Sequence, residues 1–73
     1  MAEIEVESEL TGNVWKIEVK EGDKVTEGTP LLILESMKME IPVSATEDGT
    51  LTELIAEEGQ TVTEGTVVAR IEV

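Results

Sequence analysis

The chain repeats itself: residues 38–73 echo residues 1–36 after a shift of 37 positions. The clearest block is EGDKVTEGT, residues 21–29, against EGQTVTEGT, residues 58–66. Two copies are too few for a solenoid, which needs about three or more repeats to bury a continuous core. They suit a domain with a pseudo-two-fold axis, in which each half covers the apolar face of the other. We therefore predict that residues 1–73 form one domain.

Each half has the alternating pattern of β-strands. In EIEVESEL the in-phase apolar residues are Ile4, Val6 and Leu10. In VWKIEV, Trp15, Ile17 and Val19 fall on one face, while Val14 breaks the phase and indicates a bulge. Glycine-containing turns separate the segments, and the chain closes with the β-branched run TVVARIEV. Short strands with this punctuation predict a small sandwich or barrel.

The central stretch LLILESMKMEI is ambiguous when taken alone. It is rich in helix formers, and Ile33, Met37 and Ile41 fall at helical spacing. The repeat favours strands instead, because the counterparts of LLILES and MEIPV in the other copy are strand-like. We therefore predict strands over residues 31–36 and 39–43, with the chain reversing between them. Pro42 fits an edge strand, since proline cannot donate to a neighbour on both sides.

The predicted reversal falls on Met37 and Lys38. Two-residue hairpin loops require positive φ and favour glycine or asparagine, so methionine and lysine break the local rule. Such a conflict, in a chain whose other turns contain glycine, points to a functional position. The repeat also places this junction opposite the termini, so that Lys38 projects from one end of the domain. The alternative is that the two methionines around Lys38 only fill gaps in packing.

Composition excludes several classes of function. Seventeen acidic and five basic residues give a formal net charge of −12, which argues against a nucleic acid or an anionic membrane as partner. The chain has no cysteine and no histidine and lacks the calcium-loop motif, so we expect no catalytic residue and no metal site. Its acidic start differs from a signal peptide, and no apolar run approaches the roughly 20 residues that span a bilayer. The expected location is the cytoplasm.

The motif ESMKME resembles the biotin attachment motif E-A-M-K-M of biotin carboxyl carrier proteins and biotin-dependent carboxylases. The flanking segments are similar to the rest of the biotinyl/lipoyl attachment domain, from about Ser8 to Val73. The resemblance is to a small stand-alone biotin/lipoyl attachment protein. It implies a flattened eight-stranded β-barrel or sandwich, with Lys38 acylated at an exposed hairpin by a ligase.

Two departures from the biotin motif bear on the cofactor. Ser36 stands where alanine is usual, and Glu35-Ser36 is similar to the lipoyl motif, as is the proline of EIPV. Met37-Lys38-Met39 instead resembles the biotin motif. The resemblance therefore implies biotin on Lys38, with lipoate, or acceptance of both groups, as the alternative.

The resemblance further implies that the chain is a carrier and not an enzyme. Its partners would be a biotin protein ligase or a lipoate ligase, and then a biotin- or lipoate-dependent enzyme. Met37 and Met39 would contact the ligase, and Glu35 and Ser36 would orient the hairpin for it. One rival hypothesis is a carboxylate-based enzyme, which a chain of 73 residues has little room to build. The other is an unmodified acidic interaction module whose hairpin tip binds a partner directly.

Overall fold

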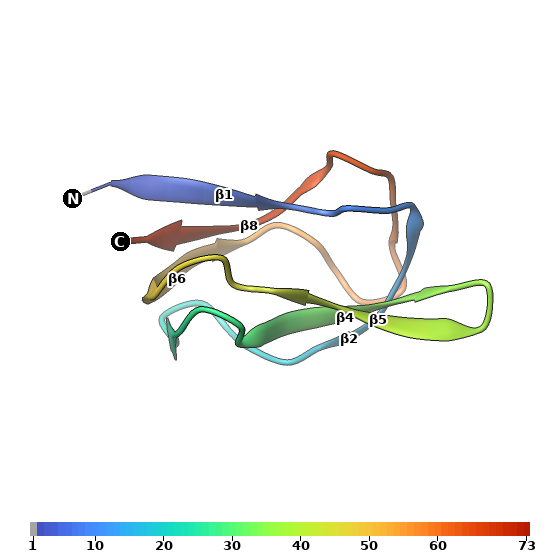
Figure 1. Cartoon of the computed structure of the whole chain (residues 1–73), viewed down its shortest axis with the longest axis horizontal. Coiled ribbons are helices and arrows are strands. Elements are labelled where there is room, and N and C mark those ends of the chain that lie inside the picture. The colour runs from blue at the N-terminus through green and yellow to red at the C-terminus, as the bar shows by residue number, and fades with distance from the viewer. Residues whose placement is uncertain (1) are drawn as a thin grey trace.

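The computed structural model describes residues 2–73 and holds them in two antiparallel four-stranded sheets. The strands are β1 (Glu3–Glu7), β2 (Gly12–Ile17), β3 (Lys24–Val25), β4 (Pro30–Ser36), β5 (Met39–Ser44), β6 (Gly49–Leu54), β7 (Thr61–Val62) and β8 (Val67–Glu72). Figure 1 shows the sheets as two layers that face each other. The predicted eight-stranded sandwich is therefore confirmed; β1 and β5 are free edges, so the barrel is not closed.

The two sheets are counterparts under the sequence repeat. The terminal sheet has the order β1-β8-β6-β3, and the hairpin sheet has the order β5-β4-β2-β7. Exchanging each strand for its repeat counterpart converts one order into the other. Turn hydrogen bonds repeat as well: the amide of Gly28 donates to Ala45 O at 2.9 Å, and that of Gly65 donates to Ser8 O at 2.8 Å. The pseudo-two-fold axis predicted from the repeat is confirmed.

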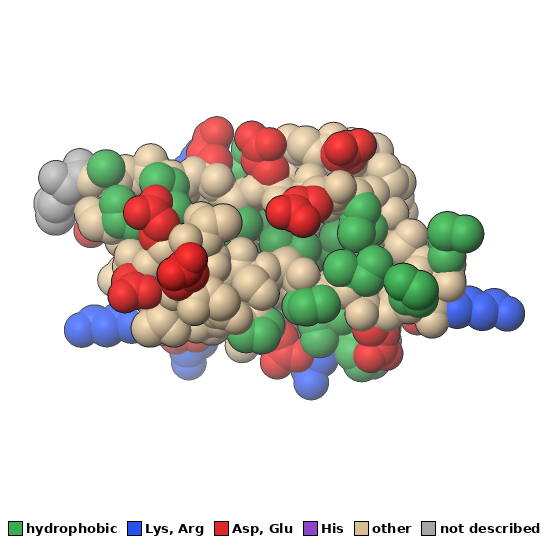
Figure 2. Space-filling model, in the orientation of Figure 1, with side chains coloured by type: hydrophobic (Ala, Val, Ile, Leu, Met, Phe, Trp, Pro, Cys, Tyr) green, Lys and Arg blue, Asp and Glu red, His purple; other side chains and the backbone are tan. Residues whose placement is uncertain are grey.

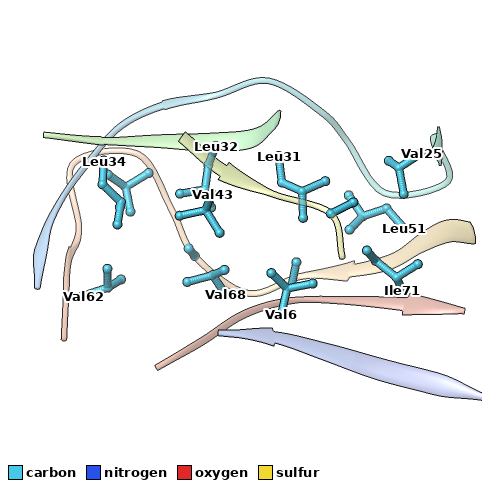
Figure 3. Packing of buried hydrophobic residues seen from close by; sticks show 14 residues of the cluster. Val6, Val25, Leu31, Leu32, Leu34, Val43, Leu51, Val62, Val68 and Ile71 are labelled. Atoms are coloured by element: carbon cyan, nitrogen blue, oxygen red, sulfur yellow. The ribbon is translucent and has the colours of Figure 1, made fainter. Parts of the chain in front are cut away.

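The core is built from the same paired positions. Leu31, Leu34 and Leu51 are fully buried, together with their counterparts Val68, Ile71 and Val14. In Figure 3, side chains of β4 and β5 point toward those of β1 and β8 from the opposite sheet. Full burial of one such side chain contributes about 1.5–3 kcal/mol. The two halves therefore contribute to one shared hydrophobic core.

The predicted bulge occurs in β2, but the prediction that Trp15 lies on the same face as Ile17 is wrong. The β2–β4 register shifts between Val14 and Lys16, which makes Trp15 the extra residue. Val14 is buried, whereas Trp15 is 50% exposed, and Ile17 packs against the core. Trp15 therefore does not share the inner face with Ile17, because the bulge resets the alternation between them.

The central stretch forms a hairpin and not a helix. Strands β4 and β5 flank a two-residue loop, and β5 is an edge strand, which accommodates Pro42 as predicted. Figure 1 shows this hairpin at one end of the molecule and both termini at the other end. The longest dimension is 37 Å against 19 and 17 Å across, so the hairpin tip is remote from the termini. No helix in the described part of the chain could cross a membrane.

Candidate functional site

The loop between β4 and β5 has a backbone that glycine would normally supply. Met37 has φ of 52° and Lys38 has φ of 65°, and within residues 2–73 they are the only non-glycine residues with positive φ. Ser36 pairs with Met39 directly below them, which defines a two-residue turn of the type that needs positive φ twice. A non-glycine residue in this region costs roughly 1–2 kcal/mol. The strain is therefore concentrated on the two residues singled out by sequence.

The base of this hairpin is held rigidly by β2. Asn13 pairs with Glu35, and the neighbouring Gly12 lies against the same strand. A Cβ atom at Gly12 would lie 2.9 Å from the carbonyl oxygen of Glu35 and 3.4 Å from Cβ of Ser36. Only glycine lets β2 approach so closely. The lysine turn is thus mounted on a strand pair that is itself supported by a third strand.

The structure brings the five predicted site residues together at one end of the hairpin. Met37 is 92% exposed and Met39 is 60% exposed, so Met37 does not serve as core filler. Lys38 and Glu35 are exposed, and Ser36 is partly buried. The tip therefore presents an amine flanked by two apolar side chains that a partner could cover. Their roles toward a ligase remain predictions.

A groove of about 460 Å³ lies between the free edges of β1 and β5. Its apolar wall includes Val6, Leu10 and Ile41, and Glu7 and Glu9 lie on its rim. In Figure 2, hydrophobic side chains gather on this face in the region between β1 and the hairpin. Its lining includes repeat counterparts from both halves, Val6 with Val43 and Glu7 with Ser44. No group of acidic side chains within residues 2–73 is arranged to hold a metal ion.

Sequence reasoning missed two carboxylates that join the halves. Oε2 of Glu58 accepts the amide of Ile17, and Oε2 of Glu21 accepts the amide of Leu54, each at 3.0 Å. Each glutamate opens one copy of the repeated block, EGDKVTEGT or EGQTVTEGT, and neither had been given a side-chain partner. The signal was present, because the same residue occupies both repeat positions and a turn alone does not need it.

The outer face of the terminal sheet carries a charged cluster that was also not predicted. The guanidinium of Arg70 donates to Glu53 and to Glu5, with 3.2 Å between Nη2 of Arg70 and Oε2 of Glu5. These hydrogen bonds raise the pKa of Arg70 above its ordinary value, and the bond with Glu53 has the larger effect. All three side chains are substantially exposed, so the cluster contributes little to stability.

The arrangement at the tip suits a substrate better than a catalyst. An ordinary lysine side chain is protonated at neutral pH and needs a base before it can attack an acyl group. The chain has no histidine that could act as that base. Lys38 projects from the end of the molecule, where another protein's active site can enclose it. The tip therefore offers an accessible amine, without a catalytic base beside it, to a second protein.

Comparison with known proteins shows the family to which the fold and the sequence are similar. The family described as biotin-requiring enzyme matches residues 2–71. A biotin/lipoyl attachment protein of Bacillus subtilis is 50% identical over 44 residues, which make up 60% of this chain and 60% of that protein. A biotinylated protein TB7.3 homolog of Mycolicibacterium smegmatis is 53% identical over 45 residues, 62% of each chain.

Among solved structures, the urea carboxylase of Kluyveromyces lactis superposes with a TM-score of 0.92 at 35% identity. That match covers 99% of this chain and 6% of the carboxylase. The chain thus spans about 60% of the length of the Bacillus subtilis relative and a small part of the large enzyme. The fold of the chain therefore recurs as one small part of a much larger enzyme.

Proposed function

The chain belongs to the biotin/lipoyl family of biotin-requiring proteins, and on that premise we propose that it carries biotin on Lys38. As a family member it is a carrier domain and not itself a catalyst. The observation that carries the assignment to Lys38 is its place in the glycine-free turn, at positive φ and exposed to solvent. No fold requirement explains a lysine there, whereas attachment of an acyl group does.

The attachment step is the formation of an amide. The partner ligase presents biotin as an acyl-adenylate and removes a proton from the ammonium group of Lys38. The Nζ atom then attacks the acyl carbon, the new C–N bond forms, and adenylate leaves with the electrons of the broken acyl–phosphate bond. One positive charge is lost from the protein, which takes the formal net charge from −12 to −13. The domain supplies an accessible amine and a fixed backbone, and the ligase supplies the base.

After loading, the domain acts as a swinging arm. Biotin, once bound, supplies the carboxyl-transfer chemistry. The flexible stem of Lys38 begins at a turn held by β4 and β5, so the arm moves while its origin stays fixed. Such tethering presents a group to an active site at an effective concentration in the ~mM range. Residues 1–73 would act as one carrier domain for a biotin-dependent enzyme in the cytoplasm, with no nucleic acid or membrane as partner.

Lipoate is the second candidate for the group on Lys38. Glu35-Ser36 precedes the lysine as in lipoyl domains, and the Bacillus subtilis relative is described as a biotin/lipoyl attachment protein. The two groups require the same geometry, which is an exposed lysine at a hairpin tip. A lipoate ligase and a lipoate-dependent enzyme would then replace the biotin-dependent partners.

Intact mass spectrometry tests the proposal directly. The protein is produced in cells supplied with biotin and lipoate, beside the Lys38→Arg variant, which keeps the positive charge. We expect one biotinyl increment on the wild type and none on the variant. A lipoyl increment would identify the second candidate. No increment, with both ligases shown to be active on control acceptors, would overturn the carrier function and favour an unmodified interaction module.

A further inference from the structure

The repeat supplies an internal control for the two outer faces of the sandwich. At the centre of the terminal sheet, Arg70 lies between Glu5 and Glu53 and binds both. The counterparts in the hairpin sheet, 37 positions away, are Ile33, Pro42 and Lys16. Ile33 pairs with Pro42 and with Lys16 in the same way. The same backbone frame thus carries a charged cluster on one face and a partly apolar surface on the other.

The residues at the two bulges also differ, with a polar residue in the terminal sheet and an apolar one in the hairpin sheet. In β6 the bulge residue is Thr52, whose hydroxyl donates to Glu3 at 2.9 Å. Its counterpart in β2 is Trp15, which is half exposed. A polar residue therefore satisfies this backbone position, and the exposed tryptophan is not needed to build the bulge.

The apolar side of the hairpin sheet is also hollowed. A shallow groove of about 560 Å³ is lined by Val19, Pro30, Ile33 and Pro42, with Glu18 and Glu40 on its rim. Along the lower edge of the view in Figure 2, below β4 and β5, hydrophobic side chains lie between charged ones. We name this surface, together with Trp15, the hairpin-sheet patch. Its groove is lined by β4, β5 and the segment that follows β2, while Trp15 lies on β2; strands β4 and β5 flank the turn that carries Lys38.

We infer that the hairpin-sheet patch is the docking surface for the ligase that acylates Lys38, an inference that rests on the proposed function. The ligase must select Lys38 among four lysines (Lys16, Lys20, Lys24 and Lys38) before any cofactor is attached. Its selectivity therefore has to come from the protein surface. An enzyme that uses the loaded arm, by contrast, gains binding energy from the cofactor itself.

The charge around the patch defines the partner further. Glu18 and Glu40 border the groove, and Lys16 is paired with Glu18 at 3.8 Å. A complementary partner surface would carry apolar side chains for the groove, flanked by lysine or arginine for the rim. Docking there would hold the ligase against β4 and β5 and bring its active site to the hairpin tip.

The test transplants the charged cluster from one sheet to the other. The triple variant Lys16→Glu, Ile33→Arg, Pro42→Glu places on the hairpin sheet the residues that the terminal sheet already tolerates. Because it changes the net charge by −2, the control is Lys24→Glu, which makes the same charge change at an exposed position of β3 in the terminal sheet. A second variant, Trp15→Thr, removes only the tryptophan. Circular dichroism and thermal unfolding verify that each protein is folded.

The readout is the rate of biotin incorporation by a purified biotin protein ligase with biotin and ATP, as a function of acceptor concentration. We expect the triple variant to raise the KM for the acceptor about tenfold, with kcat changed less than about twofold, since it replaces the apolar lining of the groove with charged side chains that are costly to desolvate in an interface. Trp15→Thr should raise KM by a smaller factor in the same direction. Lys24→Glu should match the wild type.

Three outcomes would overturn the inference. Equal KM values for the triple variant and Lys24→Glu, with the wild type biotinylated, would reject the patch and leave the carrier function intact. A wild type that receives no biotin would reject both the patch as a docking surface for the biotin ligase and biotin as the group on Lys38. A wild type that sediments as a dimer, with the triple variant a monomer, would assign the patch to contact between two copies.

Discussion

The four glycine turns and the Met37-Lys38 turn all require positive φ, but they meet this requirement with different residues. Gly22, Gly28, Gly59 and Gly65 have φ between 87° and 95°, and a Cβ atom at any of them would meet nothing within 4 Å. Glycine is used there only for its backbone freedom. The hairpin turn needs positive φ twice and yet carries two long side chains. The difference indicates that the backbone conformation determines the residue at the glycine turns. At the hairpin, the chemistry of the side chains determines which residues are present.

The strongest test of this comparison gives the hairpin the residues that its backbone favours. We expect Met37→Asn with Lys38→Gly to abolish acylation completely, because the amine is gone. The same change should raise the free energy of unfolding by about 1–2 kcal/mol, because Asn-Gly suits a turn with two positive φ values. Mass spectrometry and urea denaturation measure the two effects.

The Lys38→Arg variant is the matched control for that experiment, since it removes the amine and keeps the strained backbone. It should lose acylation without a gain in stability. If the Asn-Gly variant were no more stable than Lys38→Arg, the turn would not be strained, and the comparison with the glycine turns would fail.

The reverse change at the glycine turns should have a moderate effect. Gly28→Ala and Gly65→Ala should each lower the free energy of unfolding by about 1–2 kcal/mol, from backbone strain alone. For a domain of this size, 1 kcal/mol shifts the midpoint of thermal unfolding by roughly 4–8 °C. Since the two glycines are repeat counterparts with matching hydrogen bonds, their losses should be similar. Markedly unequal losses would show that the pseudo-symmetry of the turns does not extend to their energetics.

Much of this architecture could be predicted from sequence because the repeat compares each segment with a second copy. That comparison decided between helix and hairpin at residues 31–43, which local propensity could not do. The placement of Lys38 at the end opposite the termini follows from the same symmetry. Both features depend on chain order and turn chemistry, which the sequence states directly.

The face of Trp15 could not be predicted from alternation, because one extra residue in β2 resets the phase and either Val14 or Trp15 could be that residue. The repeat indicates which of the two is buried, because Val14 corresponds to buried Leu51, whereas Trp15 corresponds to the polar Thr52. The contacts of Glu58 with Ile17 and of Glu21 with Leu54 were missed for another reason. The repeat marked both glutamates, but their backbone partners lie in the other half of the chain, and only the folded structure reveals which amides donate to them.

A single glycine at the hairpin should have a small effect. Met37→Gly removes the cost of positive φ, but glycine also adds about 0.5–1 kcal/mol of backbone entropy to be lost on folding. We therefore expect a net gain of about 0.5 kcal/mol in the free energy of unfolding, measured by urea denaturation. A clear loss of stability would mean that the Met37 side chain stabilises the turn despite its 92% exposure.

The smallest effect is expected at the charged cluster of the terminal sheet, where neither the core nor the proposed chemistry depends on the residue. Arg70→Gln should lower the midpoint of thermal unfolding less than Gly28→Ala does, because exposed ion pairs contribute little. The raised pKa of Arg70 lies above an already high ordinary value, so its contribution is present at neutral pH and is lost only as the pH rises to strongly alkaline values. Screening of charges by salt should distinguish the two variants. Adding salt should reduce the change in unfolding midpoint caused by Arg70→Gln and leave the change caused by Gly28→Ala unaltered. A difference for Arg70→Gln that persists in high salt would indicate that its side chain acts by packing over β1 and β6, and not by its charge.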